Sequence, residues 1–283
     1  MFEQRKIAFI GSGVMGEAMI AGLLRQGMAP LSSLIAAEPR SERIDELHAQ
    51  YGINMTTENA EAADQADVIV LSVKPQSLSK VFSSVRGHIQ LHALVLSIVA
   101  GAPISKIADG LGHAAVVRSM PNTPAQIGEG ITVWTAAPAV TEQQQQMARR
   151  ILQALGEEVF VEDENYLDMA TALSGTGPAY VFMFMEAMVD AGVHLGFHRS
   201  VSERLVAQTV RGSVDYYLKK KNVAHLAAMR NQVTSPAGTT AAALYYLEKA
   251  GFRTAISRAI WAAYERSQEL GKDAKSQSPE PHS

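Results

Sequence analysis

The 283-residue sequence contains no cysteine, so disulfide bonds, thiol catalysis and cysteine-ligated metals are excluded. Positive charge is not in excess: the formal net charge of −3 gives no electrostatic footprint for nucleic acid. The longest apolar helix expected, 178–195, carries Glu186 and Asp190, which would be costly in a bilayer. Met1–Arg5 is too short and polar for a signal peptide. These absences favour a cytoplasmic globular protein with neither a membrane nor a nucleic-acid partner.

Two catalytic patterns are also missing. Gly-x-Ser-x-Gly does not occur, which disfavours the nucleophile elbow of a hydrolase. His194 and His198 have the i, i+4 spacing of zinc ligands, but Gly196 lies between them and no third ligand is evident. The sequence therefore predicts no metal site.

What is present begins with a glycine-rich turn near the N-terminus. The apolar stretch Lys6–Ile10 leads into Gly-Ser-Gly-Val-Met-Gly and then into an apolar-periodic segment that ends at Leu24. Strand, G-x-G-x-x-G and helix in this order are typical of dinucleotide binding, and a purely structural turn is the alternative. The first glycine makes the tight turn, the second lets the backbone approach a pyrophosphate, and the third lets helix pack on strand. The cofactor-binding residues predicted here are Gly11, Ser12, Gly13, Val14, Met15 and Gly16.

A second apolar strand, Leu34–Ala37, ends at Glu38, where the ribose-binding acid of such a unit falls. A carboxylate there accepts hydrogen bonds from ribose hydroxyls and repels a 2′-phosphate, which favours NADH. Arg40, Ser41 and Arg43 follow at once, and arginine suits a bidentate grip on a 2′-phosphate. The glutamate therefore favours NADH, and the arginines favour NADPH.

Short apolar strands alternate with helical segments over the first half of the chain. Further strands are expected near 68–73, 94–99, 115–118, 131–134 and 158–161, and helices near 41–51, 77–87, 103–111 and 141–155. This α/β alternation predicts a doubly wound sheet with a possible antiparallel edge. The dinucleotide-binding domain is expected to span residues 1–163.

Only helices are expected beyond that boundary, near 165–173, 178–195, 200–219, 223–232, 239–250 and 253–270. The helix 178–195 is apolar on nearly every side and must be buried all round. A small helical domain offers little depth for this, so partner subunits are expected. Residues 164–271 are predicted to form an all-helical substrate and dimerisation domain, and 272–283 a disordered tail.

Loops beyond the carboxyl ends of the strands are where a doubly wound sheet binds ligands. Three such loops combine a proline with small or polar residues, although any one alone is ordinary turn chemistry. A separate segment, Ser174–Ala179, opens the apolar helix, and its Ser174 either caps that helix, as Thr176 also could, or borders the substrate. The further cofactor-binding residues predicted from the first three loops are Val73, Lys74, Pro75, Ala100, Gly101 and Asn122.

The segment Val233–Thr240 places hydroxyls, a proline and a glycine ahead of an apolar helical run. Serine or threonine at such a position caps free N–H groups, and a glycine lets backbone amides approach a bound group closely. The helix start therefore suits an anion such as a substrate carboxylate, with an ordinary N-cap as the alternative. The substrate-binding residues predicted here are Ser235, Gly238, Thr239 and Thr240.

Together these motifs resemble the pyrroline-5-carboxylate reductases. The resemblance covers nearly the whole chain and rests on six segments in order, Phe9–Gly16, Ser72–Pro75, Ala100–Gly101, Met120–Pro124, Ser174–Tyr180 and Thr234–Thr240. It implies a Rossmann domain followed by a helical domain, and an interlocked homodimer, often assembled into decamers, with the active site at the dimer interface. It also implies hydride transfer from a reduced nicotinamide to 1-pyrroline-5-carboxylate, giving L-proline in the final step of proline biosynthesis. The Thr240 hydroxyl would be the catalytic group that orients the ring nitrogen.

The sequence departs from the family pattern at several positions. Ala237 replaces the first glycine of Ser-Pro-Gly-Gly, Asn231 takes an acidic place, and Val223 stands where some members have a glutamate. These departures leave open a divergent non-catalytic paralogue that binds NAD(P). A related dehydrogenase of hydroxy or amino acids is disfavoured, because the helices 178–195 and 200–219 offer no internal catalytic lysine. The family leans towards NADPH, so we predict that NADPH is accepted and modestly preferred, with NADH also used.

Overall fold

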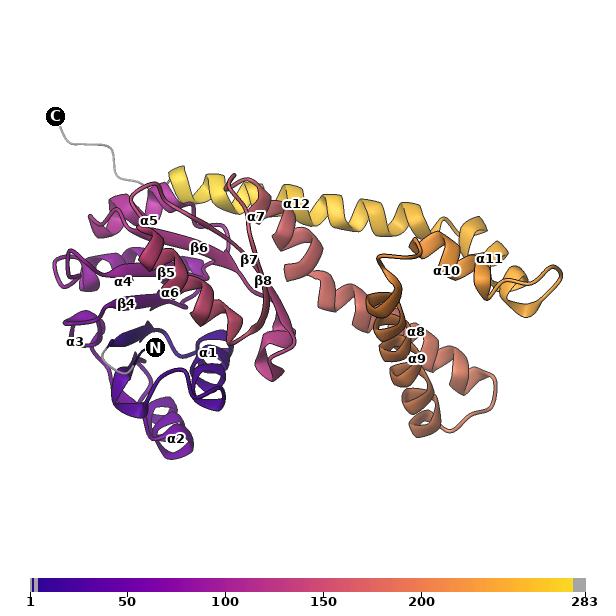
Figure 1. The fold of residues 1–283 in the computed structure, drawn as a ribbon, viewed down its shortest axis with the longest axis horizontal. Coiled ribbons are helices and arrows are strands. Elements are labelled where there is room, and N and C mark those ends of the chain that lie inside the picture. The colour runs from indigo at the N-terminus through magenta and orange to yellow at the C-terminus, as the bar shows by residue number, and fades with distance from the viewer. Residues whose placement is uncertain (1, 3–4, 277–283) are drawn as a thin grey trace. The chain divides into compact units, whose positions relative to one another are not determined.

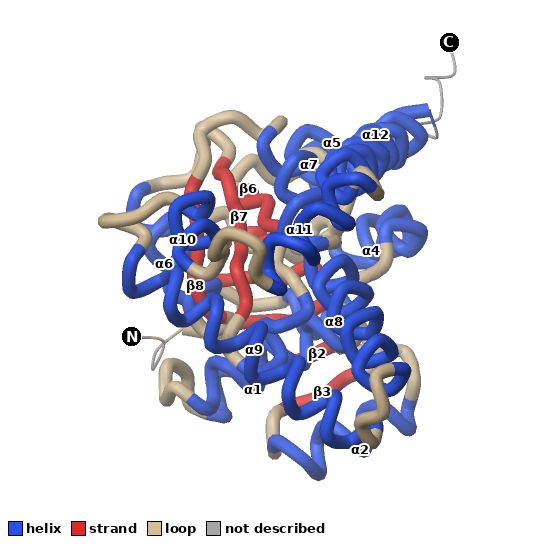
Figure 2. Tube along the Cα trace, turned by 90° about the vertical axis from the view of Figure 1, so that its right-hand side faces the viewer, coloured by secondary structure: helices blue, strands red, loops and turns tan. Residues whose placement is uncertain are grey.

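The structure is a computed structural model that describes residue 2 and residues 5–276 (Figure 1). Its N-terminal part is built on one eight-stranded sheet with the order β3-β2-β1-β4-β5-β6-β7-β8, visible as the red strands of Figure 2. The first six of these strands run parallel, in the order of a doubly wound dinucleotide fold, which confirms the predicted α/β class. The strands are β1 (Ile7–Ile10), β2 (Leu34–Ala37), β3 (Asn54–Thr56), β4 (Val68–Leu71), β5 (Leu94–Ser97), β6 (Val116–Met120), β7 (Gly130–Ala136) and β8 (Gly156–Phe160).

Both faces of the sheet are buried, which is why its central strands read as continuous apolar runs. Successive residues of β1 point to opposite faces: Ile7 and Phe9 belong to one core cluster, Ala8 and Ile10 to the other. The first cluster also contains side chains of α1 (Val14–Arg25) and α6 (Glu142–Gln153). The second contains side chains of α3 (Asn59–Ala63), α4 (Leu78–Val85) and α5 (Ile104–Leu111). Helix α2 (Ser41–Tyr51) connects β2 to β3.

The antiparallel edge is also confirmed, and it consists of two strands. Strand β7 pairs antiparallel with β6, and β8 then runs parallel to β7. The connection 121–129 contains only the short 3-10 helix Thr123–Ile127, too little chain for the crossover that a parallel strand requires. By contrast, α6 provides that crossover between β7 and β8.

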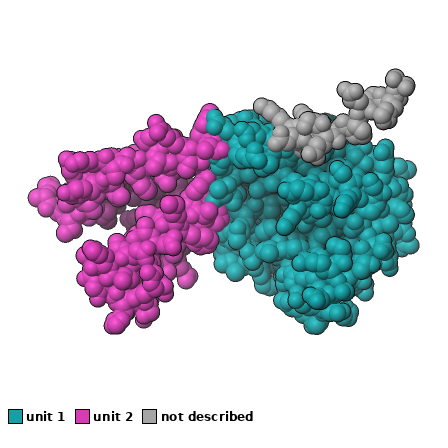
Figure 3. Space-filling view, turned by 180° about the vertical axis from the view of Figure 1, so that it is seen from behind, with its two compact units in different colours: residues 1–176, 263–283 teal, residues 177–262 magenta. Residues whose placement is uncertain are grey.

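The chain divides into two compact units, shown in different colours in Figure 3. Unit 1 comprises residues 1–176 and 263–283, and unit 2 comprises residues 177–262. This division differs from the boundaries expected at 163 and 271, because α12 (Phe252–Ser276) begins in unit 2 and ends in unit 1. Helix α12 continues to Ser276, and the last residues of the expected tail, 277–283, lie outside the described part of the chain.

A buried arginine ties the C-terminal part of α12 to the sheet within unit 1. Arg118 of β6 donates hydrogen bonds to Glu164 (2.9 Å) and to Asp168 (3.1 Å). Ser267 of α12 donates to the same oxygen of Asp168 at 3.0 Å, and Asp168 lies in α7 (Tyr166–Ala170). The network therefore joins β6, α7 and α12.

Unit 2 contains α8 (Gly177–His194), α9 (Arg199–Lys220), α10 (Leu226–Gln232), α11 (Thr239–Lys249) and the start of α12. Helices α8 and α9 approach closely at Gly192, where a Cβ atom would lie 2.6 Å from the Ser202 hydroxyl oxygen. Of the side chains in α8, only Val189 is buried in the single chain. The expectation of an all-round buried helix is therefore not met within one copy. Over residues 5–276, no helix combines the length and apolar character needed to span a bilayer.

Candidate active site

The loop between β1 and α1 has the geometry that its three glycines predict. Gly11 has φ +90°, and a Cβ atom there would lie 2.7 Å from Val73 Cγ1. A Cβ atom at Gly16 would lie 2.7 Å from both the Gly11 carbonyl oxygen and the Ser72 hydroxyl, so α1 packs directly on this turn. A Cβ atom at Gly13 would meet nothing within 4 Å. The second glycine thus faces open space, where backbone could approach a bound group.

The start of α1 retains hydrogen-bonding capacity that a phosphate could use. Its N-cap, Gly13, carries no side chain, and Glu17 N–H is the first in the helix to reach a backbone acceptor, the Gly13 carbonyl. The Ser12 hydroxyl is buried and has no hydrogen-bond partner among the described residues. Free N–H groups at a helix start and an orphaned buried hydroxyl fit an anionic pyrophosphate. The residues present therefore fit the dinucleotide predicted for this loop.

Ser72 is a member of this turn that the predicted site residues leave out. Its hydroxyl, directly after β4, donates a hydrogen bond to the Gly11 carbonyl oxygen and so fixes the glycine turn against the neighbouring strand. A hydroxyl closing an otherwise apolar strand is the sequence signal that could have identified it.

Glu38 lies at the end of β2 beside the glycine loop, with its side chain only 5% exposed. One carboxylate oxygen accepts a hydrogen bond from Ser12 N–H at 3.4 Å, and the other accepts from Arg40 Nε at 2.7 Å. Burial raises the pKa of Glu38, but the hydrogen bonds and charge of Arg40, together with the Ser12 N–H, outweigh it and hold the pKa below its ordinary value. The carboxylate is therefore ionised at neutral pH.

The loops after β4, β5 and β6 lie at the same edge of the sheet as the glycine turn. Val73 contacts the turn, and Lys74 and Pro75 are exposed beside it. Gly101 has φ +67° and follows the half-buried Ala100. The Asn122 amide donates to the Ser174 carbonyl at 3.1 Å and accepts from Ile131 N–H at 3.0 Å, so it braces this loop.

The Ser174 hydroxyl donates a hydrogen bond backward along the chain. Ser174 lies in a π-helical turn, Thr171–Gly175, and its hydroxyl donates to the Ala170 carbonyl at 3.0 Å. The Thr176 hydroxyl likewise donates to the Thr171 carbonyl at 2.8 Å. Both hydroxyls thus donate to carbonyls about one turn earlier, and the Thr171 carbonyl also accepts a hydrogen bond from Thr176 N–H.

In unit 2, the segment ahead of α11 forms a turn that leaves the helix start open. The N-cap is Gly238 rather than a serine or threonine, and no side chain caps the helix. A Cβ atom at Gly238 would lie 2.5 Å from the Ser235 hydroxyl oxygen, so a larger residue there would displace the Ser235 side chain. Thr239 and Thr240 occupy the first turn, the former exposed and the latter half-buried. Their uncapped N–H groups fit an anionic ligand.

The predicted site residues thus fall on both units. The glycine loop, Glu38, Arg40, Ser41, Asn122, Ser174 and the loops after β4 and β5 belong to unit 1, and Ser235, Gly238, Thr239 and Thr240 belong to unit 2.

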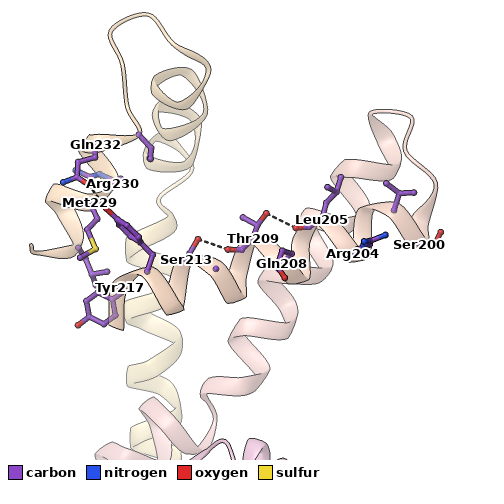
Figure 4. A pocket seen from close by; sticks show the side chains of 15 residues that line it. Ser200, Arg204, Leu205, Gln208, Thr209, Ser213, Tyr217, Met229, Arg230 and Gln232 are labelled. Carbon is purple, nitrogen blue, oxygen red and sulfur yellow. Dashed lines mark hydrogen bonds between the residues drawn. The ribbon is translucent and has the colours of Figure 1, made fainter. Parts of the chain in front are cut away.

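A separate apolar groove of 1310 Å³ lies within unit 2, lined by side chains of α9 and α10 (Figure 4). Leu205 and Thr209 line it from α9 and Met229 from α10, and none of its lining residues is a predicted site residue. The hydroxyls of Thr209 and Ser213 donate to carbonyls one turn back along α9, as the dashed lines of Figure 4 show. The groove therefore presents mainly apolar surface.

Comparison with known families gives two matches along the chain. The family described as pyrroline-5-carboxylate reductase dimerisation matches residues 164–270. The family described as NADP oxidoreductase coenzyme F420-dependent matches residues 6–101.

Similar individual proteins cover nearly the whole chain. The pyrroline-5-carboxylate reductase of Synechocystis is 42% identical over 267 residues, covering 94% of this chain and 98% of that protein. The enzyme of the same name from Escherichia coli is 37% identical and covers 95% of this chain and 99% of its own. The crystal structure of Plasmodium falciparum pyrroline carboxylate reductase with NADP bound superimposes with a TM-score of 0.86 at 33% identity, covering 95% of this chain and 99% of that one.

Proposed function

The chain belongs to the pyrroline-5-carboxylate reductase family, and from that premise we propose that it reduces 1-pyrroline-5-carboxylate to L-proline with NADPH, the final step of proline biosynthesis. Whole-length similarity to reductases of that name is the observation that carries the proposal. The open glycine loop of unit 1 and the open start of α11 in unit 2 support it, because the reaction needs one site for a dinucleotide and one for a carboxylate.

Residues of unit 1 would hold the dinucleotide. The backbone of Gly11–Gly16 and the orphaned Ser12 hydroxyl would bind the pyrophosphate, and Glu38 and Arg40 would meet the adenosine ribose. The loops after β4, β5 and β6 would line the part of the site that binds the nicotinamide. NADPH is supported by the relative solved with NADP bound.

Residues of unit 2 would hold the substrate. Its carboxylate would accept hydrogen bonds from the free N–H groups at the start of α11 and from the Ser235 hydroxyl. The Thr240 hydroxyl would accept a hydrogen bond from the N–H of the protonated ring imine. This contact fixes the orientation of the ring.

The chain contributes to catalysis mainly by positioning. When bound, the reduced nicotinamide supplies a hydride to the imine carbon of the substrate. The segment 234–240 contains no Asp, Glu or His that could donate a proton, so we propose that the imine enters already protonated. The proton then remains on the nitrogen of proline. The loops hold the reacting carbon at a fixed distance and exclude water.

We further propose that a second copy completes each active site. Helix α8 and the groove of unit 2 leave apolar side chains uncovered in one chain, and the dimerisation family matches this region. A homodimer would cover that surface, and pairs could assemble further into decamers.

Oxidation of NADPH in the presence of 1-pyrroline-5-carboxylate tests the proposal directly. We expect absorbance loss at the reduced-nicotinamide band only with substrate, and stoichiometric proline by amino-acid analysis. NADPH binding without turnover would instead support the non-catalytic paralogue. Oxidation of a hydroxy or amino acid, with no reduction of the imine, would support the related dehydrogenase.

A further inference from the structure

An ion pair occupies the point where the proposed dinucleotide site would meet the adenosine ribose. Arg40 Nε donates to a Glu38 carboxylate oxygen at 2.7 Å, and the Arg40 backbone N–H contacts the same oxygen at 3.4 Å. The Glu38 side chain is 5% exposed, whereas that of Arg40 is 66% exposed. Glu38 is also tied to the glycine loop through Ser12 N–H. The carboxylate is therefore the fixed partner of the pair and the guanidinium the movable one.

The second arginine after β2 is engaged elsewhere. Arg43 pairs with Glu17 of α1 and with Glu46 at 3.0 Å, and its Nε contacts the Ser12 carbonyl oxygen at 3.4 Å. Its side chain is 20% exposed. Arg43 thus holds α1 to α2, and a ligand would have to break these contacts to recruit it. Arg40 has to break only its pair with Glu38.

We propose that the Glu38–Arg40 pair sets the dinucleotide preference of this chain by exchanging between two arrangements. In the first, the pair stays closed and Glu38 accepts hydrogen bonds from the ribose hydroxyls of NADH. In the second, Arg40 turns away from Glu38 and grips the 2′-phosphate of NADPH. This inference rests on the proposed function, because it concerns the cofactor of that same site.

The two arrangements oppose each other, so the discrimination should be small. A 2′-phosphate gains the Arg40 contact but removes that contact from Glu38 and brings a second negative charge beside an ionised carboxylate. A ribose without the phosphate keeps the pair intact but gains no new cation. We therefore expect both dinucleotides to bind, with affinities within about tenfold of each other.

Calorimetric titration with adenosine 2′,5′-bisphosphate and with ADP tests the pair without any turnover. Glu38→Gln keeps the size of the side chain, removes the repulsion and frees Arg40, so the bisphosphate should bind about tenfold tighter and ADP no tighter. Arg40→Met keeps much of the aliphatic stem but removes the charge. The bisphosphate should then bind about tenfold weaker, with ADP nearly unchanged.

The double variant Glu38→Gln with Arg40→Met separates an exchange from two independent effects. If Glu38 acts partly by holding Arg40, the gain from Glu38→Gln should shrink when Arg40 is absent. Arg43→Met serves as the comparison: it should weaken both ligands alike, because it loosens the packing of α1 against α2. Circular dichroism and thermal melting establish that each variant is folded.

Three outcomes would overturn the inference. The affinities for the bisphosphate and for ADP could change equally in either single variant, or the effects of the two substitutions on bisphosphate affinity could be fully additive in the double variant. Finally, Arg43→Met could lower the bisphosphate affinity more than Arg40→Met does. If the wild type binds neither the bisphosphate nor ADP, the dinucleotide site itself is overturned. If the variants change ligand binding as expected but the protein does not reduce the imine, the inference about Glu38 and Arg40 holds and the proposed function fails. NADPH and NADH titrations by nicotinamide fluorescence should follow the same order as the two adenosine probes.

Discussion

Thr240 differs from the alanines that follow it in α11 by a hydroxyl and a methyl group, and only the hydroxyl can hydrogen-bond the substrate. Thr240→Ala should lower turnover with 1-pyrroline-5-carboxylate roughly threefold to tenfold, because one neutral hydrogen bond is worth about 0.5–1.5 kcal/mol. Steady-state kinetics measure the loss, and thermal melting should be unchanged. Thr254→Ala, an exposed threonine of α12, is the matched control and should retain full activity. Unchanged kinetics in a folded Thr240→Ala protein would remove this residue from the site.

Gly13 allows a sharper experiment, because the free protein has room for a larger side chain. Its backbone is extended (φ −69°, ψ −174°), and a Cβ atom meets nothing within 4 Å. Gly13→Val should therefore fold normally yet lose dinucleotide binding, since the valine fills the space meant for pyrophosphate. Gly16→Ala should instead destabilise the fold, because its Cβ meets the Gly11 carbonyl. Dinucleotide titration and melting temperature distinguish the two, and wild-type affinity in Gly13→Val would refute the phosphate role.

Residues whose function depends on backbone geometry were more predictable from sequence than residues whose side chains choose between partners. The roles of Gly11 and Gly16 in turn and packing follow from the absence of a Cβ atom, and the structure shows both. The hydroxyl of Ser174 could reach forward to cap α8 or backward to a carbonyl, and sequence spacing does not decide between them. The sequence likewise does not determine that Arg40 pairs with Glu38 and Arg43 with Glu17, because these partners depend on how the elements fold together.

At the scale of an element, the turn that precedes α11 contains an alanine in an unusual conformation. Ala237 has φ +56°, in the left-handed region that costs a non-glycine residue about 1–2 kcal/mol. Ala237→Gly should leave stability unchanged or raise it by up to about 1 kcal/mol, since relief of strain is offset by greater freedom of the unfolded chain. Ala237→Val should lower stability by more than about 1 kcal/mol, because a β-branched residue is a genuine outlier there.

Thermal melting of the two Ala237 variants measures this difference. Ala237 is exposed, so added volume should cause no clash and the effect should report the backbone alone. Ala242→Val, at an exposed helical position of α11, is the control and should cost only the helix propensity of valine, less than about 0.7 kcal/mol. Equal melting temperatures for Ala237→Val and Ala242→Val would contradict a strained turn.

Elements with a clear hydrophobic pattern were predictable, and elements without one were not. The buried strands β4 and β5 and the helix α2 lie where their apolar runs and periodicity place them. Strand β3, Asn-Met-Thr, is short and polar, and it owes its pairing to β2 rather than to its own pattern. The π-helical turn at 171–175 is likewise set by packing, since its sequence reads as an ordinary helix.

At the scale of the whole molecule, the two-domain order could be predicted from where strands give way to helices. The division between units could not, because α12 is one uninterrupted helix that contributes to both. Periodicity identifies such a helix but contains no information on which core each half joins. The Arg118 network that holds its second half depends on residues far apart in the chain, such as Asp168 and Ser267.

The apolar surface of unit 2 leads to the last prediction, that the protein self-associates. Phe182 and Met183 of α8 are 60% and 74% exposed in the single chain and belong to a run of exposed apolar residues, 181–184, of the kind that marks an interface. Sedimentation velocity at micromolar concentration should therefore show a dimer or a larger assembly. Phe182→Glu should shift the protein towards monomer, because a desolvated carboxylate without a partner opposes the interface. Lys219→Glu, at the polar end of α9, should leave assembly intact. If the wild type sediments as a monomer and reduces the imine at full rate, both the burial argument and the shared active site fail, because a lone chain would then suffice.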